Sequence, residues 1–559
     1  MHKLDSVIAL SVLALTAAFA AAHESSQHAA EKAIRLAQAR ANADALNVEA
    51  LRKLPQCRVT LRVLEFGGDE PVAANIRVLD VESGKAVPLS GEIHRANNWY
   101  SVDAGAVISL PQMKLTLQAI RGPETERTQV TLDLRGKATF AAEVSIRRFY
   151  DAKFRGLRSA NTHLHLMNLT HEEALRYLRV VPQCDDLDLV FLSHLRRIPD
   201  ERTYISNRIV EESFAGGSLK RLSRHGALYI NGEEHRHNFG RGGEGFGHVM
   251  LLDLQKLIRP VSIGPGIMRE GTDGLPLQRG IQEARKDGAT VVWCHNSFGH
   301  EDLPNWLAGL IHAQNIFDGG SHGSYQDTFY RYLNLGMKVP FSTGTDWFVY
   351  DFARVYVPLD ADMTSEAWLK QLRDGRSFIT NGPFLELVAE RGNVGDTIAL
   401  PGPGRLTFMA KGMGRLDYGG LEIVYNGKVV GRAPATREGG YFFTDKHFAV
   451  ELPEPGWVAL RIPLETTDNE FGRPLFAHTS PIYIEMNNKS VFKHEVAEGM
   501  LQEIEGSVKR IDEQAVFANK RERASVMDVY AKATSQLQTM LKAATPKSTP
   551  GDEDKKNKE

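Results

Sequence analysis

The chain has 559 residues, of which 42% are hydrophobic and 24% charged, and its formal net charge is -2 at pH 7. Because domains average roughly 150 residues, we expect three or four folding units with sizeable cores. This composition excludes a wholly disordered or collagen-like chain. It also argues against a nucleic-acid binder, since neutralising phosphates requires an excess of Lys and Arg on at least one face.

The first 22 residues have the pattern of a secretory signal peptide. Lys3 precedes an apolar run that begins at Val7, and small residues offer cleavage sites near Ala20 or Ala22. The alternative is a membrane anchor, but the run is shorter than the roughly 20 residues that span a bilayer. We therefore predict cleavage of residues 1–22, a secreted or periplasmic protein, and no membrane span after cleavage.

The rest of the chain divides by its hydrophobic patterns. An Ala-rich stripe with a period of three to four residues predicts an N-terminal helix over 23–54, and short alternating runs between turn residues predict a β-sandwich over 55–155. Apolar runs that alternate with amphipathic helices predict an α/β unit over 156–385, open or closed as a barrel. The helices are expected at 172–180, 275–286, 305–317 and 365–372.

The patterns of β structure return over 386–488, where Asn426-Gly427 after an apolar run indicates a hairpin. Residues 489–545 read as helical, and 546–559 as a disordered tail rich in Pro, Ser and charge. The fold class predicted is therefore multidomain α/β plus β.

The cysteines are Cys57, Cys184 and Cys294; they can form one bridge but no disulfide framework, and Cys294 fits a buried small hydrophobe.

Metal-ligand residue types recur where the apolar runs of the α/β unit end. His163 and His165 form an i, i+2 pair, which places both imidazoles on one side of a strand. Taken alone, each such residue is as simply explained by a structural hydrogen bond or ion pair. Because the carboxyl ends of strands converge on one face of a barrel or open α/β sheet, their recurrence predicts a shared metal site. The candidate ligands are His163, His165, His171, His194, Glu234, His248, His295 and Asp346.

Through these motifs the chain resembles the PHP (polymerase and histidinol phosphatase) superfamily and, more narrowly, the CehA/McbA-type metallohydrolases. The resemblance covers residues 155–390 and extends less sharply to the flanking β regions. It implies a distorted seven-stranded (β/α) barrel between an N-terminal β-sandwich and a C-terminal β-rich domain with a helical tail. The matching motifs are His163-Leu164-His165, His171, Ser193-His194, Gly232-Glu233-Glu234, Gly247-His248, His295 and Gly344-Thr345-Asp346.

The resemblance also implies the ligand sets. His163, His165, Glu234 and Asp346 would hold one ion, with Glu234 bridging to a second, and His171, His194, His248 and His295 would complete the neighbouring positions. The chain departs from the family pattern at Ser193, where an Asp is often found, and at Phe348, where a His is expected. One or two divalent ions are therefore expected. Imidazole and carboxylate ligands suit zinc, manganese or iron.

Such a site hydrolyses its substrate by activating a bound water and polarising the scissile bond. Asp346 is expected to accept the proton of the attacking water, Glu234 to act from the bridging position, and His295 or His300 to protonate the leaving group. Arg241 could clamp an anionic group of the substrate together with His300, or simply be a solvated loop charge. His235 and His237 either line the cleft or are loop residues.

Three functions remain open from the sequence. The first is a metal-dependent hydrolase that cleaves an ester, carbamate or amide bond of a small molecule. The second is a phosphoesterase, which should collect cations around the phosphate, whereas few basic residues lie near the motifs. The third is a catalytically decayed binding or scaffold protein. The sequence does not indicate an oligomeric state.

Overall fold

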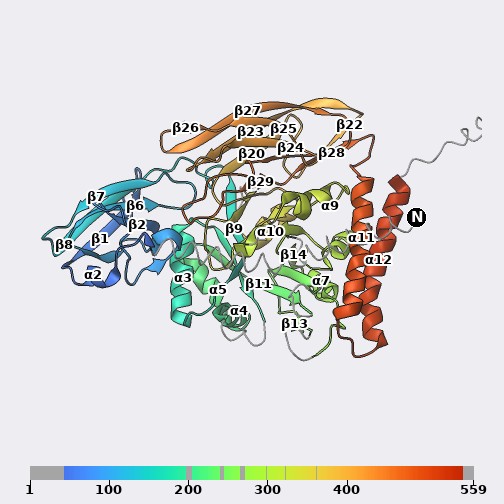
Figure 1. Cartoon of the computed structure of the whole chain (residues 1–559), viewed down its shortest axis with the longest axis horizontal. Helices are drawn as coiled ribbons and strands as arrows, with labels where there is room; N and C mark the ends of the chain where they lie inside the picture. Colours follow the sequence, from blue (N-terminus) through green and yellow to red (C-terminus); the bar gives the residue numbers. More distant parts are fainter. Residues whose placement is uncertain are drawn as a thin grey trace, which may run out of the picture.

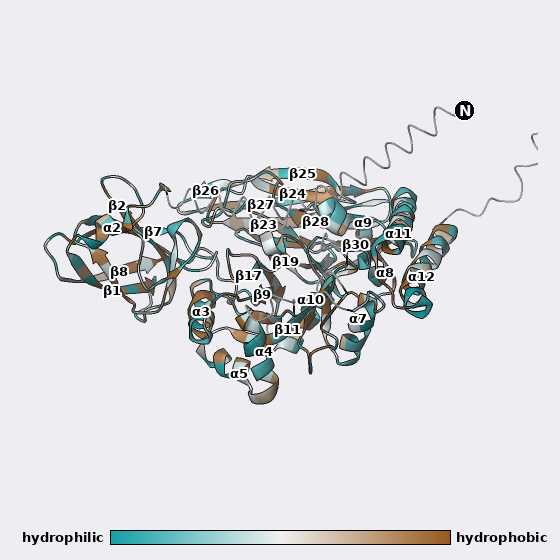
Figure 2. Cartoon of the chain, turned by 60° about the horizontal axis from the view of Figure 1, so that its bottom comes forward, coloured by the Kyte–Doolittle hydropathy of each residue, from teal (hydrophilic) through white to brown (hydrophobic). Residues whose placement is uncertain are grey.

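The computed structural model describes residues 43–196, 204–239, 245–264, 271–296, 299–320, 323–359 and 362–544. The expected signal peptide over 1–22, the tail over 546–559 and Arg241 lie outside these ranges. The described chain is a mixed α/β structure with several sheets and more than one domain. Its N-terminal strands lie at one end and a C-terminal helix pair at the other, as both whole-chain views show (Figure 1, Figure 2).

The N-terminal strands form two sheets around one core. Along the first strand, Cys57, Val59, Leu61 and Val63 are buried while the residues between them are exposed, so this alternation fixes which face turns inward. The sheets have the orders β5-β1-β8 and β3-β4-β2-β6-β7. The strands are β1 Gln56–Glu65, β2 Ala74–Asp80, β3 Ile93–His94, β4 Tyr100–Val102, β5 Val107–Pro111, β6 Lys114–Ile120, β7 Thr128–Asp133 and β8 Thr139–Ile146.

Of the helix expected over 23–54, the described residues contain the short helix α2, Val48–Arg52. Asn47 caps its start, since its side-chain oxygen accepts a hydrogen bond from the Ala50 backbone N–H. Before this cap the chain is extended, and Ala45 forms a bridge to Ala86. The Ala-rich pattern therefore does not continue as one helix through this stretch.

The α/β region is built on strands that run in one direction. β9 pairs in parallel with β10 and β17, β10 with β11, and β14 with β15, which pairs with β16. The strands are β9 Leu157–His165, β10 Leu189–His194, β11 Leu228–His237, β12 Gly247–Leu252, β13 Ser262–Ile263, β14 Thr290–Trp293, β15 Ala313–Asn315, β16 Phe341–Ser342, β17 Asp346–Trp347, β18 Arg354–Pro358 and β19 Phe378–Thr380.

Strand β12 runs in the opposite direction, because it pairs antiparallel with both β11 and β14, and β18 likewise pairs antiparallel with β9. The first residues of β12, Gly247 and His248, therefore lie at the edge where β11 and β14 end. The helices of this region are α3 His171–Cys184, α4 Ile205–Gly216, α5 Ser218–Leu222, α7 Leu277–Lys286, α8 Asp302–Leu307, α9 Arg331–Leu333 and α10 Ser365–Arg373.

The helix expected at 305–317 is wrong over most of its length. Helix α8 ends at Leu307, and residues Ala313–Asn315 form strand β15 instead. Ala313 and Gln314 pair with Val292 and Trp293 of β14, so the apolar residues of this stretch are buried in a sheet. The difference matters because the loop after β15 reaches the candidate site.

The second strand-rich region contains the predicted hairpin. Asn426 and Gly427 connect β24 to β25 with positive φ angles of 49° and 85°, the conformation that makes Asn-Gly favourable in tight hairpins. Its strands are β20 Phe384–Ala389, β21 Gly392–Asn393, β22 Thr397–Leu400, β23 Gly404–Gly414, β24 Gly420–Tyr425, β25 Lys428–Pro434, β26 Thr436–Glu438, β27 Tyr441–Leu452, β28 Gly456–Arg461, β29 Ala477–Thr479 and β30 Ile482–Met486.

The C-terminal helices α11, His494–Gln514, and α12, Lys520–Ala544, pack against each other, and α12 packs against α8. Their buried residues recur every three or four positions, as one face of a helix requires. They belong to the same hydrophobic core as the strands of the α/β region: Met500, Ile504 and Ile511 on α11, and Val526, Tyr530, Ala533 and Leu537 on α12. None of the helices in the described ranges has the length and apolarity needed to cross a lipid bilayer.

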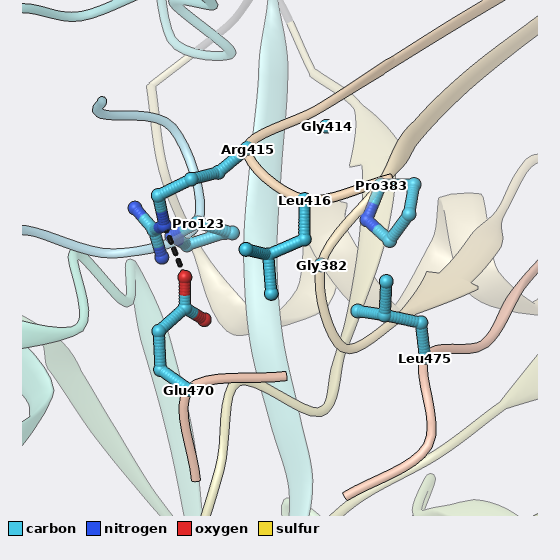
Figure 3. A pocket seen from close by; sticks show the side chains of 8 residues that line it. All are labelled: Pro123, Gly382, Pro383, Gly414, Arg415, Leu416, Glu470 and Leu475. Atoms are coloured by element: carbon cyan, nitrogen blue, oxygen red, sulfur yellow. Dashed lines mark hydrogen bonds and ion pairs between the residues drawn. The ribbon is translucent and has the colours of Figure 1, made fainter. Parts of the chain in front are cut away.

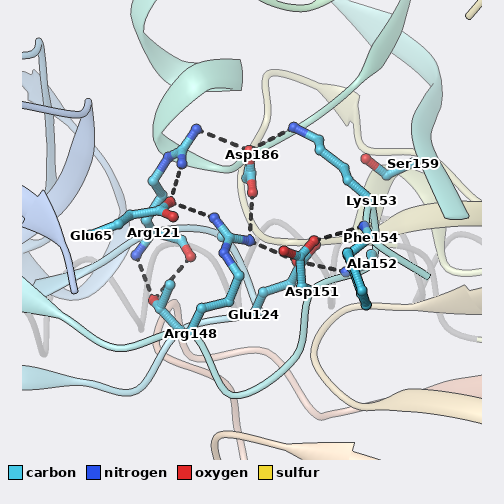
Figure 4. A network of polar contacts seen from close by, with 12 residues as sticks. Glu65, Arg121, Glu124, Arg148, Asp151, Ala152, Lys153, Phe154, Ser159 and Asp186 are labelled. Atoms are coloured by element: carbon cyan, nitrogen blue, oxygen red, sulfur yellow. Dashed lines mark hydrogen bonds and ion pairs between the residues drawn. The ribbon is translucent and has the colours of Figure 1, made fainter. Parts of the chain in front are cut away.

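Ion pairs connect the N-terminal strands to the α/β region. Asp186, which follows α3, lies 3.0 Å from Arg121, 2.8 Å from Arg148 and 3.0 Å from Lys153. Figure 4 shows the three cationic side chains pointing toward this carboxylate. Burial alone would raise the pKa of Asp186, but the three cations hold it below its usual range.

A buried arginine joins the two strand-rich regions. Arg415 pairs with Glu470 and donates hydrogen bonds to the carbonyl oxygens of Gly122 and Thr125, which belong to the N-terminal region. The two charged side chains point toward each other beside Pro123 (Figure 3). Both are less than a tenth exposed, so removing one partner would leave the other charge buried without a counter-charge or water.

The first prediction concerns this pair. We expect Arg415→Met to lower the free energy of unfolding by about 3 kcal/mol, because Glu470 would stay buried without its cation. Arg405→Met is the matched control, since Arg405 and its partner Glu451 are 63% and 75% exposed and such pairs contribute about 1 kcal/mol or less. Urea unfolding followed by tryptophan fluorescence measures both. Equal effects would contradict the role given to Arg415.

The second prediction concerns His478 of β29. Burial lowers the pKa of His478 from 6.5 to about 3. Its Nδ1 donates a hydrogen bond to the Thr479 carbonyl oxygen at 2.7 Å, and its Nε2 accepts one from the Tyr330 hydroxyl at 2.7 Å, so the neutral ring is fully hydrogen-bonded. The unfolded chain binds the proton that charges His478 more tightly than the folded chain does. The buried, neutral His478 therefore contributes to stability in full above pH 6.5, and this contribution is lost as the pH falls toward 3.

We therefore expect the thermal midpoint to fall as the pH is lowered from about 6.5 to about 4, and to fall less steeply in His478→Gln, which accepts the same hydrogen bond without titrating. His447→Gln, at an exposed position of β27, should leave the slope unchanged. Scanning calorimetry across this pH range measures the three slopes. Identical slopes for wild type and His478→Gln would refute the assignment.

Candidate metal centre

The centre begins at the end of β9. Alternation along this strand turns His163 and His165 to the same face, and both side chains are fully buried. Their Nε2 atoms lie 3.1 Å apart. Two ligands of one tetrahedral ion with bonds of about 2.0 Å lie roughly 3.3 Å apart, so this separation suits a shared ion.

Two carboxylates from other strands complete the first ligand group. Glu234 of β11 places Oε2 2.9 Å from His165 Nε2, and Asp346 of β17 places Oδ1 3.4 Å from His163 Nε2. One ligand atom from each of the four residues lies within 4.8 Å of the others. The sequence-predicted set of His163, His165, Glu234 and Asp346 is therefore brought together at the carboxyl ends of β9 and β11 and at β17.

A second ligand group uses the other oxygen of Glu234. Its Oε1 lies 3.3 Å from His248 Nδ1 and 3.8 Å from His295 Nε2, and these three residues also fall within 4.8 Å of one another. His248 comes from the start of β12 and His295 follows β14. The Glu234 carboxylate thus lies between two groups, with one oxygen toward each.

A third combination of ligand types lies behind the two histidines. Asp318, in the turn after β15, places Oδ2 2.8 Å from His163 Nδ1 and Oδ1 3.4 Å from His295 Nδ1. Cys294 lies in the same group, so its thiol faces polar neighbours as well as the core. In the described part of the chain all three cysteines are buried and free, Cys57 and Cys184 included.

Backbone and amide oxygens orient the remaining two imidazoles. His165 Nδ1 lies 3.1 Å from the Ser193 carbonyl oxygen, and His248 Nε2 lies 2.9 Å from Asn238 Oδ1. Because these oxygens can only accept, each of these nitrogens carries the proton. The nitrogen that faces Glu234 is then unprotonated in the neutral ring, as metal ligation requires.

Two buried oxygens show that the residues fit a cation. Among the described residues, neither Glu234 Oε1 nor Asp346 Oδ1 has a hydrogen-bond partner, although both are buried. Leaving a buried carboxylate oxygen unsatisfied costs stability, and a divalent ion at each group would remove this cost. The donor set of imidazoles and carboxylates suits zinc, manganese or iron.

The charges of the centre are coupled. Burial would raise the pKa of Glu234, but Arg236 and the histidines around it hold that pKa well below its usual range. Burial also opposes charge on His163, yet Asp346 and Asp318 raise its pKa well above the usual value. Burial and the neighbouring Arg236 lower the pKa of His248. The surroundings therefore keep the Glu234 carboxylate charged and the His248 imidazole neutral.

The backbone at the centre adopts uncommon conformations. His295, Asp346, Phe317 and Phe348 have positive φ angles of 54°, 59°, 63° and 57°. Such angles cost free energy in residues other than glycine, and they cluster where surrounding structure holds a functional geometry. Here they direct two candidate ligands, His295 and Asp346, into the groups around Glu234.

The structure places the other predicted residues elsewhere. His194 Nε2 lies 3.1 Å from Glu211, and His171 Nε2 lies 3.5 Å from Glu212, both on α4. Neither histidine belongs to the ligand groups found among the described residues. The cause for His194 is strand alternation, because its neighbours Val190 and Leu192 pack against α3 and α4 while Ser193 takes the opposite face.

The remaining predicted residues are also accounted for. His300 is half-buried with Nδ1 3.1 Å from Ser507 Oγ of α11, so it contacts the pair of C-terminal helices rather than a ligand group. His235 and His237 lie in β11 itself, where alternation with Glu234 turns them to the opposite face. His235 fills space at α7, because a Cβ at Gly280 would lie 2.2 Å from its Nε2.

Sequence reasoning missed Asp318 and the position of Cys294. Asp318 comes three residues after β15, in the same strand-end position that drew attention to the other ligands. The hydrophobic pattern does not mark this position because it predicts a helix over 305–317. A search of protein-family models and a search of curated proteins both find no match to this chain.

The third prediction concerns Gly344, which precedes Asp346 and touches His163. A Cβ at this position would lie 2.6 Å from His163 Cβ and 2.7 Å from its backbone nitrogen. We expect Gly344→Ala to displace His163 and weaken zinc binding by about tenfold or more, as measured by titration calorimetry. Gly216→Ala, where a Cβ meets open space, should bind zinc like wild type. Unchanged affinity in Gly344→Ala would contradict the ligand role of His163.

Proposed function

We propose that this chain is a metal-dependent hydrolase with two divalent ions that share the Glu234 carboxylate. The observation that carries the proposal is the division of its two oxygens between two ligand groups, 2.9 Å from His165 on one side and 3.3 Å from His248 on the other. A bridging carboxylate between imidazoles is the usual arrangement for paired ions that act on one water.

The resemblance to the PHP superfamily, and to the CehA/McbA-type metallohydrolases within it, is part of this proposal. It is supported by the common edge on which His163, His165, Glu234 and Asp346 meet, and by the start of β12 at that same edge. A distorted barrel of the PHP type would account for the parallel pairs of neighbouring strands in the α/β region. His171 and His194 would then have no part in binding the two ions.

Divalent ions held at these groups would supply Lewis-acid polarisation and lower the pKa of a bound water. The residues contribute the rest. Asp346, whose Oδ1 points into the first group, is placed to accept the proton of the attacking water. His295, held by Asp318 through Nδ1 and 3.8 Å from Glu234 through Nε2, would ligate the second ion and would not carry the proton of the leaving group.

The charges favour an ester, carbamate or amide substrate. Arg236 is the cation of β11 that shares the inward face with Glu234, and its Nη1 lies 3.4 Å from Glu234 Oε1. This guanidinium is therefore engaged with the bridging carboxylate. A phosphoesterase would instead direct cations at the phosphate, and Arg241, the other candidate clamp, lies outside the described residues.

The fourth prediction tests the function. We expect protein stripped with a chelator to be inactive and to regain turnover with zinc or manganese, with p-nitrophenyl acetate preferred over p-nitrophenyl phosphate. His163→Ala/His165→Ala should lose at least about 100-fold in kcat, because two ligands of one ion are gone. His171→Ala, which changes a histidine outside the groups, should keep wild-type activity.

Equal activity of the double variant and wild type, or no turnover with any added metal, would refute the hydrolase. A preference for the phosphate ester would support the metal-dependent hydrolase but would show that its substrates are phosphate esters. Metal binding without turnover of either ester would point to the scaffold function.

A further inference from the structure

Two histidines of different ligand groups face the same carboxylate. His163 directs Nε2 toward His165 and Asp346, and His295 directs Nε2 toward Glu234. Their opposite nitrogens, the Nδ1 atoms, both face Asp318, at 2.8 Å and 3.4 Å. The Asp318 side chain is fully buried, so water does not compete for these contacts.

Asp318 can act only as an acceptor here. Oδ1 also accepts a hydrogen bond from the His295 backbone N–H at 3.2 Å, and Oδ2 accepts one from Asn315 Nδ2 at 3.1 Å. An ionised carboxylate surrounded by donors requires the protons of both imidazoles to lie on Nδ1. In a neutral ring this leaves each Nε2 with a free lone pair directed at a ligand group.

We infer that Asp318 is a positioning residue that orients His163 and His295 together and so couples the two metal positions. The inference rests on the proposed function, since it assigns those positions to ions. A single carboxylate sets the tautomer and the ring direction in both ligand groups, whereas His165 and His248 are each held by a separate oxygen.

The competing interpretation is a separate ion bound by His163, Cys294, His295 and Asp318. The two nitrogens of the His163 ring argue against it, because Nε2 is already directed at the first group. Binding a further ion through Nδ1 would require the ring to lose both of its N–H protons. A proton on Nδ1 instead gives a charge-assisted hydrogen bond of ordinary length to Asp318, at 2.8 Å.

The substitution Asp318→Asn discriminates between these interpretations. The His295 backbone N–H cannot turn away from the Oδ1 position, whereas the side-chain amide of Asn315 beside Oδ2 can turn, so the new amide keeps its oxygen at Oδ1 and its NH2 group faces His163 Nδ1. His163 then moves its proton to Nε2 and loses the lone pair directed at the first group. His295 keeps its acceptor.

The fifth prediction follows for metal uptake. Zinc titration calorimetry, with elemental analysis of the loaded protein, should find two tight ions in wild type. Asp318→Asn should keep one of them and bind the other about 10 to 100 times more weakly, the usual loss when the hydrogen-bond partner of a metal-ligating His is removed. Asp318→Ala, which takes the acceptor from both rings, should weaken both ions.

Asp273→Asn is the matched control. Asp273 is a fully buried carboxylate 2.8 Å from His237 Nε2, but His237 lies on the opposite face of β11 from Glu234 and belongs to no ligand group among the described residues. This variant should retain both ions. If it loses zinc as Asp318→Asn does, or if Asp318→Asn retains both ions at wild-type affinity, the role of Asp318 is refuted.

Two spectra complete the test. In the metal-free protein, at a pH high enough for both rings to be neutral, nitrogen NMR of labelled histidine should show His163 and His295 protonated on Nδ1 in wild type, with one of these signals moving to the Nε2 tautomer in Asp318→Asn. This result decides the placement of the protons even if wild type binds no ion, in which case the proposed function alone fails. With cobalt, a sulfur-to-metal charge-transfer band that vanishes in Cys294→Ser would establish the separate ion and overturn the inference.

Discussion

The Glu234 carboxylate is the constraint on which the arrangement of this centre depends. It is almost fully buried, and burying an ionised carboxylate is costly unless cations or hydrogen-bond donors surround it. Here imidazoles from β9, β12 and the loop after β14 surround it, together with Arg236 of its own strand. The charge of one residue therefore ties together segments that lie far apart in the sequence.

The direction of the strands makes this possible. Parallel strands deliver His165 and Glu234 to one edge, while β12 runs in the opposite sense and brings His248 to that edge from its beginning. Positive φ angles then turn His295 and Asp346 inward at the ends of their segments. The surrounding domains hold this geometry in place through buried contacts, such as those of Arg415 and of the C-terminal helix pair.

The sequence was sufficient to predict which side chains gather when each one lies at the end of a recognisable strand. His163, His165, Glu234 and Asp346 meet this condition, and their ligand atoms lie within 4.8 Å of one another. His194 also ends a strand, but a displacement by one residue sends a side chain to the other face, and neighbouring apolar residues do not reveal which face is inward when the strand is buried on both sides.

Other features could not be predicted because they depend on tertiary structure. The strand at Ala313–Asn315 is too short to show a period of its own, so the hydrophobic pattern predicts a helix there and does not mark Asp318 as a residue that follows a strand. The contacts of Arg415 with the carbonyl groups of Gly122 and Thr125 join residues almost 300 positions apart, and no local pattern encodes them. The hairpin at Asn426-Gly427, by contrast, is encoded by two adjacent residues and is confirmed.

The most direct test of the account is a crystal structure of zinc-loaded protein with anomalous scattering measured at the zinc edge. We expect two peaks about 3.5 Å apart. One should lie among His163, His165, Glu234 and Asp346, the other among Glu234, His248 and His295, with Glu234 contributing an oxygen to each. A single peak, or zinc bound away from Glu234, would contradict the shared carboxylate and with it the proposed two-ion hydrolase.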